Sequence, residues 1–350
     1  MMTERLAFPS RYAKQALFAG IGTDGQAALS RSRVLICGCG ATGGVIAETL
    51  ARAGVGFLRI VDRDFVELSN LQRQVLFDER DAIEQTPKAV AAGERLRAIN
   101  SEIEIDAVVA DVGPENALSL ARGCDLLLDG TDNFETRFLL NDAALDTGTP
   151  WIYSGVIGGH GQTMTVLPGE TACLRCLIET PPDPGATETC DTAGVIGPAV
   201  HAIASLAVAD AFKILIGRRD LIRPRLLMCD VWQGTLREVD TTPLRAGGGC
   251  AACGRGERAW LHGVAGSRAA VLCGRNAVQI TPGETIELDL GAVADRLAAS
   301  GTVKRTPYLV RVSATEPRCE LTVFRDGRAI VRGTEDLAAA RSIYTRLVGL

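Results

Sequence analysis

The chain has little histidine, no excess of positive charge and no long uninterrupted apolar segment. Its three histidines, His160, His201 and His262, share no spacing typical of a metal site or of a Ser-His-Asp triad, which argues against both. Lysine and arginine number 37 against 42 acidic residues, giving a formal net charge of −5. Because proteins that hold nucleic acid through its phosphates usually carry a basic excess, we expect no nucleic-acid partner.

No segment predicts a secretory signal or a membrane span. The N-terminal residues carry charges at Glu4, Arg5, Arg11 and Lys14 with no apolar run behind them. The most apolar stretch, residues 193–209, is shorter than the ~20 residues that cross a bilayer, so we predict a buried core helix there. We expect no membrane partner and a cytoplasmic location, where the eleven cysteines would serve as structural thiols, metal ligands or nucleophiles rather than disulfides.

The first half of the chain alternates between strand-like and helix-like segments. Residues 33–62 are typical of a strand, a tight glycine turn, a helix and a second strand. A further helix is predicted over residues 86–100, with strands over residues 102–109 and 125–128. This alternation favours an α/β fold: a Rossmann-like, doubly wound, mainly parallel sheet covered on both faces.

The glycine turn GCGATG, residues 38–43, matches the G-x-G-x-x-G pattern between a strand and a helix. Asp62 lies 19 residues past Gly43, at the end of the second strand, where a carboxylate can accept hydrogen bonds from ribose hydroxyls. The glycines let a phosphate approach the backbone, and the helix N-terminus supplies N–H donors. Nucleotide binding is therefore predicted, although the motif alone would favour a nicotinamide-dependent dehydrogenase.

Three charged side chains separate these two classes of nucleotide site. Arg73 lies in VDRDFVELSNLQRQVLF (residues 61–77), Lys88 on the next predicted helix, and Asp132 in DGTDN after a later strand. All three are expected at the carboxyl edge of the sheet, where ligands bind in such folds. Each alone would be an ordinary surface residue. Together they suit a triphosphate with a divalent ion, whereas a dinucleotide needs no such cluster beyond its pyrophosphate.

Five motifs together resemble the bacterial relatives of ubiquitin-activating enzymes. They are the glycine turn, residues 61–77, DGTDNFETR, and the C-x-x-C pairs Cys173/Cys176 and Cys250/Cys253, which occur in the order typical of that family. The resemblance covers roughly residues 8–255. It implies a homodimer that uses Mg-ATP to adenylylate the C-terminal glycine of a small ubiquitin-like sulfur-carrier protein ending in Gly-Gly, for molybdopterin or thiamine-thiazole biosynthesis.

The resemblance also implies roles for single residues. It places Ala41 and Asp62 beside the adenosine and Mg²⁺ on Asp132. It implies that Arg11 and Lys14 of one subunit reach the ATP of the other; Lys14 stands where the family usually has an arginine, so the bidentate fork is lost there. The residues implied to bind the nucleotide are Gly38, Gly40, Ala41, Gly43, Asp62, Asp64, Ser69, Asn70, Gln72, Arg73, Lys88, Asp132 and Asn133, with Asn70, Arg73 and Lys88 on the phosphates.

The implied reaction brings a carboxylate to the α-phosphate of ATP. Two unit negative charges 4 Å apart repel by ~4 kcal/mol at an effective dielectric constant of 20, so the site needs local cations. A terminal carboxylate is already ionised at neutral pH, so no general base is required. The residues expected to take part in the chemistry are Arg73, Lys88, Asp132, Cys190, Arg11 and Lys14.

The two C-x-x-C pairs have the ligand number and local spacing of a tetrahedral zinc site. A site shared by such distant pairs would staple the segment before the C-terminal unit onto the preceding domain. Four cysteines leave no open coordination position, so we predict a structural Zn²⁺. Redox-active dithiols are the alternative, but neither pair begins a helix of a thioredoxin-like unit.

The resemblance also implies that Cys190, in ETCDTAGVIGP, is the candidate for a covalent bond to the carrier. It lies in a polar loop just before the predicted core helix, where the field of a helix N-terminus would favour a thiolate. The alternative is a packed or incidental thiol. We expect the acyl-adenylate to become a thiocarboxylate, through either a persulfide sulfur donor or Cys190. Cys273, in LCGRNAVQI, lacks the features of a rhodanese loop, so no sulfur transfer is expected there.

A glycine run, AGGGCAACGRGE, marks a boundary near residue 246. Beyond it, a hairpin with Asp326-Gly327 at its turn and a closing helix over residues 336–348 predict a small α+β unit. The predicted division is an N-terminal helical segment (1–30), an ATP-binding adenylation domain (31–249), a zinc-linked connector (250–260) and a small α+β C-terminal domain (261–350).

Three other functions are compatible with parts of the sequence. A related adenylating enzyme would act on a peptide precursor or a modified tRNA; the cysteine pairs and the acidic total disfavour the tRNA. An NAD-dependent oxidoreductase would use the glycine turn but not Arg73 and Lys88. A non-catalytic scaffold would have no need of Asp132, Arg73 and Lys88 together.

Overall fold

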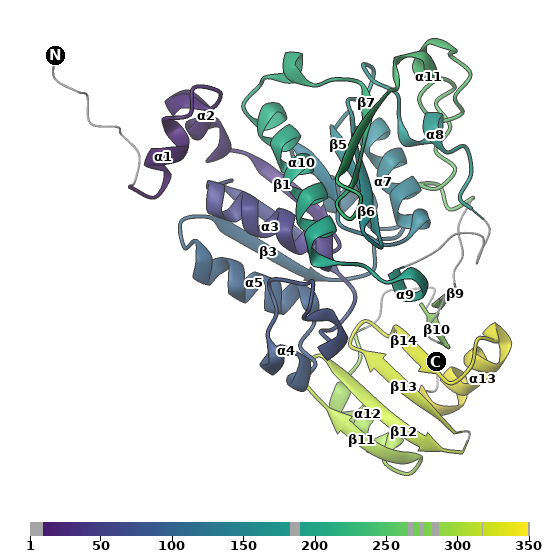
Figure 1. The fold of residues 1–350 in the computed structure, drawn as a ribbon. Helices are drawn as coiled ribbons and strands as arrows, with labels where there is room; N and C mark the ends of the chain where they lie inside the picture. The colour runs from purple at the N-terminus through teal and green to yellow at the C-terminus, as the bar shows by residue number, and fades with distance from the viewer. Residues whose placement is uncertain are drawn as a thin grey trace. The chain divides into compact units, whose positions relative to one another are not determined.

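The computed structural model describes residues 10–182, 190–264, 269–272, 276–281, 287–316 and 318–348. The chain divides into two compact units, one of residues 1–182 and 193–265 and the other of residues 183–192 and 266–350. Figure 1 shows a sheet with helices in each unit. The sheet of the second unit is coloured yellow-green to yellow. The domain boundaries expected at residues 30, 249 and 260 stay predictions.

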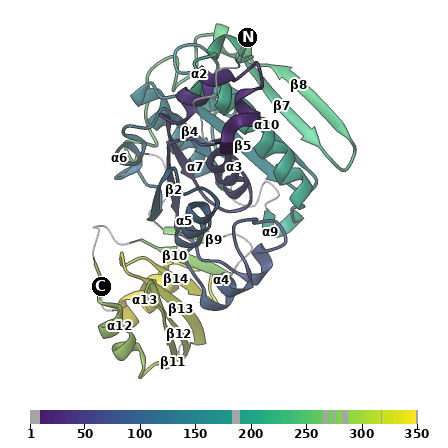
Figure 2. The same cartoon turned by 90° about the vertical axis from the view of Figure 1, so that its left-hand side faces the viewer.

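A sheet of eight strands forms the centre of the first unit, with the order β3-β2-β1-β4-β5-β6-β7-β8 among the described residues. The first five strands in this order, β3, β2, β1, β4 and β5, are parallel to one another. Strands β6, β7 and β8 continue the sheet with antiparallel pairing. Figure 2 shows β7 and β8 as a hairpin at the edge of the sheet. The strands are β1 (Arg33–Cys37), β2 (Phe57–Asp62), β3 (Glu104–Val109), β4 (Leu126–Asp129), β5 (Trp151–Ile157), β6 (His160–Val166), β7 (Arg225–Asp230) and β8 (Thr235–Asp240).

Helices pack on both faces of this sheet because successive strand residues point to opposite sides. In β1, Val34 and Ile36 join a core with α2, α3, α5 and α10, whereas Leu35 and Cys37 join a second core with α6, α7 and α8. The predicted doubly wound, mainly parallel α/β fold is confirmed. The helices are η1 (Ser10–Tyr12), α1 (Ala13–Ala16), α2 (Gly22–Leu29), α3 (Ala41–Ala53), η2 (Leu68–Asn70), α4 (Glu79–Glu84), α5 (Lys88–Ile99), α6 (Ala117–Ala121), α7 (Phe134–Thr147), α8 (Leu174–Leu177), α10 (Gly197–Leu215), η3 (Arg219–Leu221) and α11 (Thr242–Ala246).

Helix α10 contains much of the apolar stretch of the sequence. By length and composition it is the one helix among the described residues that would suffice to cross a membrane. Its residues Ile203, Ala207 and Ala211 are buried in the core with β4 and β5. The predicted core helix is therefore present, over Gly197–Leu215.

The second unit contains an antiparallel sheet with the order β11-β12-β13-β14-β10-β9. Val310 and Val312 of β12 point into its core, where Tyr344 and Leu347 of the closing helix also lie. Gly327 has a φ of 81° at the turn between β13 and β14, as the predicted hairpin requires. The elements are α9 (Cys190–Ala193), β9 (Ala269–Leu272), β10 (Ala277–Ile280), α12 (Leu290–Leu297), β11 (Gly301–Arg305), β12 (Leu309–Thr315), β13 (Arg318–Phe324), β14 (Ala329–Arg332) and α13 (Leu337–Val348).

Candidate functional site

The turn between β1 and α3 is built of glycine because the neighbouring backbone leaves no room for side chains. Gly38 has a φ of 82°, in the left-handed region. A Cβ on Gly43 would lie 1.8 Å from the carbonyl oxygen of Gly38, and one on Gly130 would lie 2.3 Å from the same oxygen. The glycine turn is therefore packed directly against the backbone that follows β4.

Gly40 differs from these glycines because the protein itself leaves space beside it. A Cβ there would meet no described atom closer than Gln74 Nε2, at 3.5 Å. Steric crowding within the chain thus gives no reason for glycine, whereas a phosphate approaching the backbone does. Gly40 also precedes the first residue of α3, Ala41, whose helix N-terminus has no side-chain cap. The N–H groups of this first turn are available to an anion.

Asp62 stands beside this turn at the end of β2. Its Oδ2 accepts from the backbone N–H of Cys39 at 2.8 Å, and its Oδ1 accepts from that of Asp64, also at 2.8 Å. Burial raises the pKa of the Asp62 carboxyl, and the positive charge of Lys88 opposes that rise. Asp62 thus fixes the glycine turn relative to β2. Its contact with a ribose stays a prediction.

Lys88, the first residue of α5, supplies a buried cation. Its Nζ lies 3.3 Å from Asp64 Oδ2, and only 8% of its side chain is exposed. Burial alone would lower the pKa of Lys88, but attraction by the carboxylates of Asp64, Asp62 and Asp132 raises it well above its ordinary value. The structure therefore brings together four of the predicted nucleotide-binding residues, and Lys88 stays charged among them.

Asp132 and Asn133 follow β4 and begin α7. Asp132 is exposed, and its carboxylate forms no hydrogen bond with the described residues, so its oxygens are open to a cation. Asn133 is the N-cap of α7, where its Oδ1 accepts from the backbone N–H of Thr136 at 2.8 Å. The amide nitrogen of Asn133 is the part of that side chain left for a ligand.

A buried ion pair holds the backbone just before Asp132. Asp129 Oδ1 accepts from the backbone N–H and the hydroxyl of Thr131, at 2.8 and 2.6 Å, and its Oδ2 accepts from Arg137 Nε at 3.0 Å. Arg137 Nη2 donates in turn to the carbonyl oxygen of Thr131 at 2.8 Å. Sequence reasoning missed this pair, although both residues lie in DGTDNFETR. An aspartate at the end of an apolar strand, with an arginine eight residues later, was the available signal.

Gln74 is a second residue that sequence reasoning missed. It is buried, with 5% of its surface exposed, and its Oε1 has no hydrogen-bond partner among the described residues. Its Nε2 faces the open space at Gly40. An unpaired buried amide oxygen is costly unless a donor reaches it, so Gln74 Oε1 is a candidate acceptor for a ligand at the glycine turn, and Gln74 Nε2 could donate to a phosphate there.

The remaining residues of the 61–77 motif form a tight turn around η2. Asn70 is buried, and its Oδ1 accepts from the backbone N–H of Glu67 at 3.0 Å. Arg73 Nη1 donates to the carbonyl oxygen of Ser69 at 2.9 Å, and Gln72 Nε2 donates to that of Val195 at 3.3 Å. The side chain of Asn70 thus shapes the turn, and phosphate contacts by this group stay predictions.

The predicted N-terminal cations lie away from Lys88 of their own chain. Arg11 Nη1 donates to the carbonyl oxygen of Ile99 at 2.9 Å, and Lys14 is exposed nearby in sequence. Ile99 ends α5 and Lys88 begins it, so these positions are about 16 Å apart at 1.5 Å per helical residue. Arg11 is therefore unable to serve the same-chain nucleotide site in this position.

The four cysteines of the C-x-x-C pairs converge. Their sulfur atoms all lie within 4.8 Å of one another. The distances are 3.9 Å for Cys173–Cys176, 3.7 Å for Cys173–Cys250 and 3.3 Å for Cys176–Cys253. Four sulfurs at about 2.3 Å from one zinc ion would be separated by about 3.8 Å, so these residues fit a tetrahedral Zn²⁺.

Two other cysteines receive little description. Cys190 is the first residue of α9 and belongs to the second unit; its side chain and residues 183–189 lie outside the described residues. Cys273 also lies outside them. The covalent role predicted for Cys190 stays a prediction.

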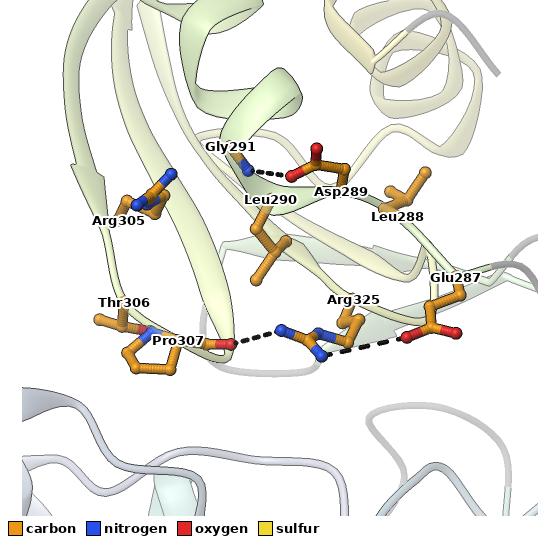
Figure 3. Close-up of a pocket in the computed structure, with 9 residues that line it drawn as sticks. All are labelled: Glu287, Leu288, Asp289, Leu290, Gly291, Arg305, Thr306, Pro307 and Arg325. Atoms are coloured by element: carbon orange, nitrogen blue, oxygen red, sulfur yellow. Dashed lines mark hydrogen bonds and ion pairs between the residues drawn. The ribbon is translucent and has the colours of Figure 1, made fainter.

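A cavity of about 730 Å³ lies within the second unit, beside the start of α12. Figure 3 shows Arg305 and Arg325 on opposite sides of Leu290 in this cavity. Arg325 donates to the carbonyl oxygen of Pro307 at 3.2 Å and lies 3.9 Å from Glu287. None of the predicted site residues lines the cavity.

Comparison with known proteins identifies the family. A sequence model of the ThiF family matches residues 12–250. The chain belongs to the ThiF family. The sulfur carrier protein ThiS adenylyltransferase of Bacillus subtilis is 45% identical over 340 residues, covering 97% of this ThiF-family chain and 99% of the relative.

One further relative agrees with this assignment, and a solved structure shares the fold. The sulfur carrier protein adenylyltransferase of Thermus thermophilus is 37% identical over 249 residues, covering 70% of this chain and 90% of the relative. The crystal structure of E. coli MccB with succinimide aligns with a TM-score of 0.60 at 22% identity, over 71% of this chain and 75% of that one. At that identity the comparison shows the fold alone, and it confirms the mixed α/β fold with a mainly parallel sheet.

Proposed function

We propose that this chain activates the sulfur carrier of thiamine biosynthesis. Adenylylation of a ubiquitin-like sulfur carrier, for thiamine or molybdopterin biosynthesis, is the function of this ThiF-family enzyme at the coarser level. The finer assignment is supported by the alignment with ThiS adenylyltransferase over 97% of the chain, compared with 70% for the Thermus relative. The single observation that carries the chemistry is the cluster of Lys88, Asp64 and Asp132 beside the glycine turn.

In the proposed reaction, the carrier's terminal carboxylate attacks the α-phosphorus of ATP. A new carbon–oxygen–phosphorus linkage forms, and pyrophosphate leaves. Lys88 and Arg73 offset the repulsion between the two anions by charge and alignment. Mg²⁺ held by Asp132 would neutralise further charge on the triphosphate. Because the carboxylate arrives ionised, none of these residues has to remove a proton.

The site also requires a second copy of the chain in this proposal. Arg11 lies at the far end of α5 from Lys88, so Arg11 and Lys14 would serve the nucleotide of the other subunit in a homodimer. Each ATP would then meet cations from both chains. This arrangement is supported by the position of Arg11 and awaits its own test.

Transfer of the acyl group to a sulfur atom follows adenylylation in the proposed sequence. A sulfur nucleophile attacks the acyl carbon, and AMP leaves. The nucleophile is the persulfide of a separate donor or the thiol of Cys190. The four-cysteine site takes no part in this step, because a zinc ion held by Cys173, Cys176, Cys250 and Cys253 has no open coordination position.

Pyrophosphate exchange tests this proposal. The purified chain is incubated with ATP, Mg²⁺, labelled pyrophosphate and either a ThiS-type carrier or the corresponding carrier of molybdopterin biosynthesis. We expect rapid exchange with the ThiS-type carrier and a slower rate with the other. Exchange only with the molybdopterin carrier would overturn the pathway assignment, and no exchange with either would overturn adenylylation itself.

A further inference from the structure

Helix α7 carries two consecutive polar residues that the proposed chemistry does not use. Asn141 and Asp142 are fully buried, on a helix whose neighbouring residues Leu140 and Ala143 are apolar and also buried. The Nδ2 of Asn141 and the Oδ1 of Asp142 have no partner among the described residues. A buried polar side chain with an unpaired atom destabilises a core. The hydrogen bonds that these two residues do form must therefore be what keeps them there.

Asn141 holds the first cysteine pair. Its Oδ1 accepts from the backbone N–H of Leu174 at 2.9 Å. Leu174 directly follows Cys173 and begins α8, which contains Cys176. The first N–H groups of a helix have no intrahelical partner, so Asn141 caps α8 from another helix. It thereby fixes the short segment from which two of the four sulfurs project.

Asp142 holds the chain that follows the second cysteine pair. Its Oδ2 accepts from the backbone N–H groups of Trp260 and Leu261, at 3.0 and 3.4 Å. The ring of Trp260 packs on Phe138 of the same helix, with their centroids 5.3 Å apart.

Arg258 links this segment to the second pair itself. It donates to the carbonyl oxygen of Ala252, which lies between Cys250 and Cys253, at 3.0 Å. Arg258 also attracts the carboxylate of Asp142. Both cysteine pairs are thus connected to adjacent positions of one rigid helix.

We propose that Asn141 and Asp142 are positioning residues of the four-cysteine site, which hold the two pairs at the spacing that a zinc ion needs. The inference rests on the structural zinc proposed above, and it is independent of which carrier the enzyme activates. Partners outside a metal's ligand shell typically change metal affinity 10- to 100-fold when removed. The pair therefore sets how slowly zinc leaves the site.

Zinc release from the full-length protein tests this. Release to an excess of chromogenic chelator is followed for wild type, Asn141→Leu and Asp142→Leu, which remove the acceptor, and for Asn141→Asp and Asp142→Asn, which keep one. We expect release about 10-fold faster in each leucine variant and within about threefold of wild type in the conservative ones. Thr147→Ala is the control, because Thr147 ends the same helix, is exposed, and its hydroxyl bonds to Ala143 and Thr149, away from the cysteine pairs.

Thermal unfolding separates positioning from a general loss of packing. The rise in Tm on zinc loading is measured for each variant against its own metal-free form. We expect the leucine variants to lose most of that rise and the conservative variants to keep it. If a leucine variant fails to fold, Asn141→Ser or Asp142→Ser replaces it, because serine is polar but too short to reach the backbone N–H groups.

Two results would overturn the inference. One is a leucine or serine variant that releases zinc at the wild-type rate, or loses equal stability with and without metal. The other is a wild-type protein that binds no zinc. Failure of adenylylation would be recognised separately, by the absence of pyrophosphate exchange in a protein that still holds zinc normally.

Discussion

Two glycines of the G-x-G-x-x-G turn have different physical reasons for being glycine. Gly43 has the backbone of Gly38 1.8 Å from where its Cβ would be, whereas Gly40 has open space. Gly43 is therefore required by the fold, whereas we propose that Gly40 is required by the ligand. The pattern predicted the turn and gave no means of separating these roles, because crowding depends on the backbone after β4.

Alanine substitutions distinguish the two glycines. Gly43→Ala should lower the free energy of unfolding by roughly 3 kcal/mol, because the backbone has to move. Gly40→Ala should leave unfolding within about 0.5 kcal/mol of wild type and weaken ATP binding at least ~10-fold. Denaturant unfolding and nucleotide titration measure the two effects. If the Gly40→Ala protein bound ATP with unchanged affinity, no phosphate of ATP would bind at this turn.

Lys88 provides a prediction about pH. Its pKa in the folded protein is raised, so its ion pair is complete below the ordinary lysine pKa of about 10.4 and is lost only as the pH rises through the folded value. The difference in Tm between wild type and Lys88→Met should therefore be the same at pH 7 and pH 9. A difference that shrinks markedly by pH 9 would mean that Lys88 is already losing its proton there.

Removing the positive charge of Lys88 should also slow the reaction. Lys88→Met should lower pyrophosphate exchange by about 10²- to 10³-fold, as expected for a preorganised group that stabilises charge. Lys88→Arg is the control that keeps the charge and should retain more activity than Lys88→Met. If the Lys88→Met variant were as active as wild type, the triphosphate would have to bind away from Lys88.

Helix α7 connects the nucleotide edge of the sheet to the cysteine cluster. Its first turn is fixed by Asn133 and by the Asp129–Arg137 pair. Its middle holds Leu174, beside the first cysteine pair, through Asn141, and Trp260, after the second pair, through Asp142. The sequence predicted the strand before α7 and the polar loop at its start. It gave no sign of the inner contacts, because residues such as Asp142 and Leu261 are far apart in sequence and no periodicity links them.

The ion pair at the start of α7 should be essential to stability. Arg137→Met leaves Asp129 buried without its cation, which should cost about 3–5 kcal/mol in the free energy of unfolding. The double variant Arg137→Met/Asp129→Asn should recover part of that loss, because no charge is then left unpaired. Urea unfolding of the single and double variants provides the comparison. A single variant as stable as wild type would contradict the burial of this pair.

The arrangement of the two chains in a homodimer is the feature of the whole molecule that sequence and structure leave as a proposal. The resemblance implied it, and the position of Arg11 at the far end of α5 supports it. The fold class and the small second unit, by contrast, were predictable from the sequence, because they follow from local alternation of strands and helices. A site shared between chains depends on surfaces that no local pattern encodes.

Mixing two inactive variants tests the shared site. In a mixed dimer of Arg11→Ala and Lys88→Met chains, one nucleotide site keeps both Lys88 and the other chain's Arg11. Random reassembly of equal amounts should therefore restore about one quarter of wild-type exchange activity. No recovery, with dimers confirmed by light scattering, would mean that Arg11 does not act on the other chain's ATP.

The central claim is that fixed charges beside the glycine turn bring a carrier's carboxylate to the α-phosphate of ATP. The most direct test is pyrophosphate exchange by wild type and Asp132→Ala with ATP, Mg²⁺ and a carrier ending in Gly-Gly. The account predicts rapid exchange by wild type and none above background by the variant. Full exchange by Asp132→Ala, or exchange that needs no carrier, would contradict it.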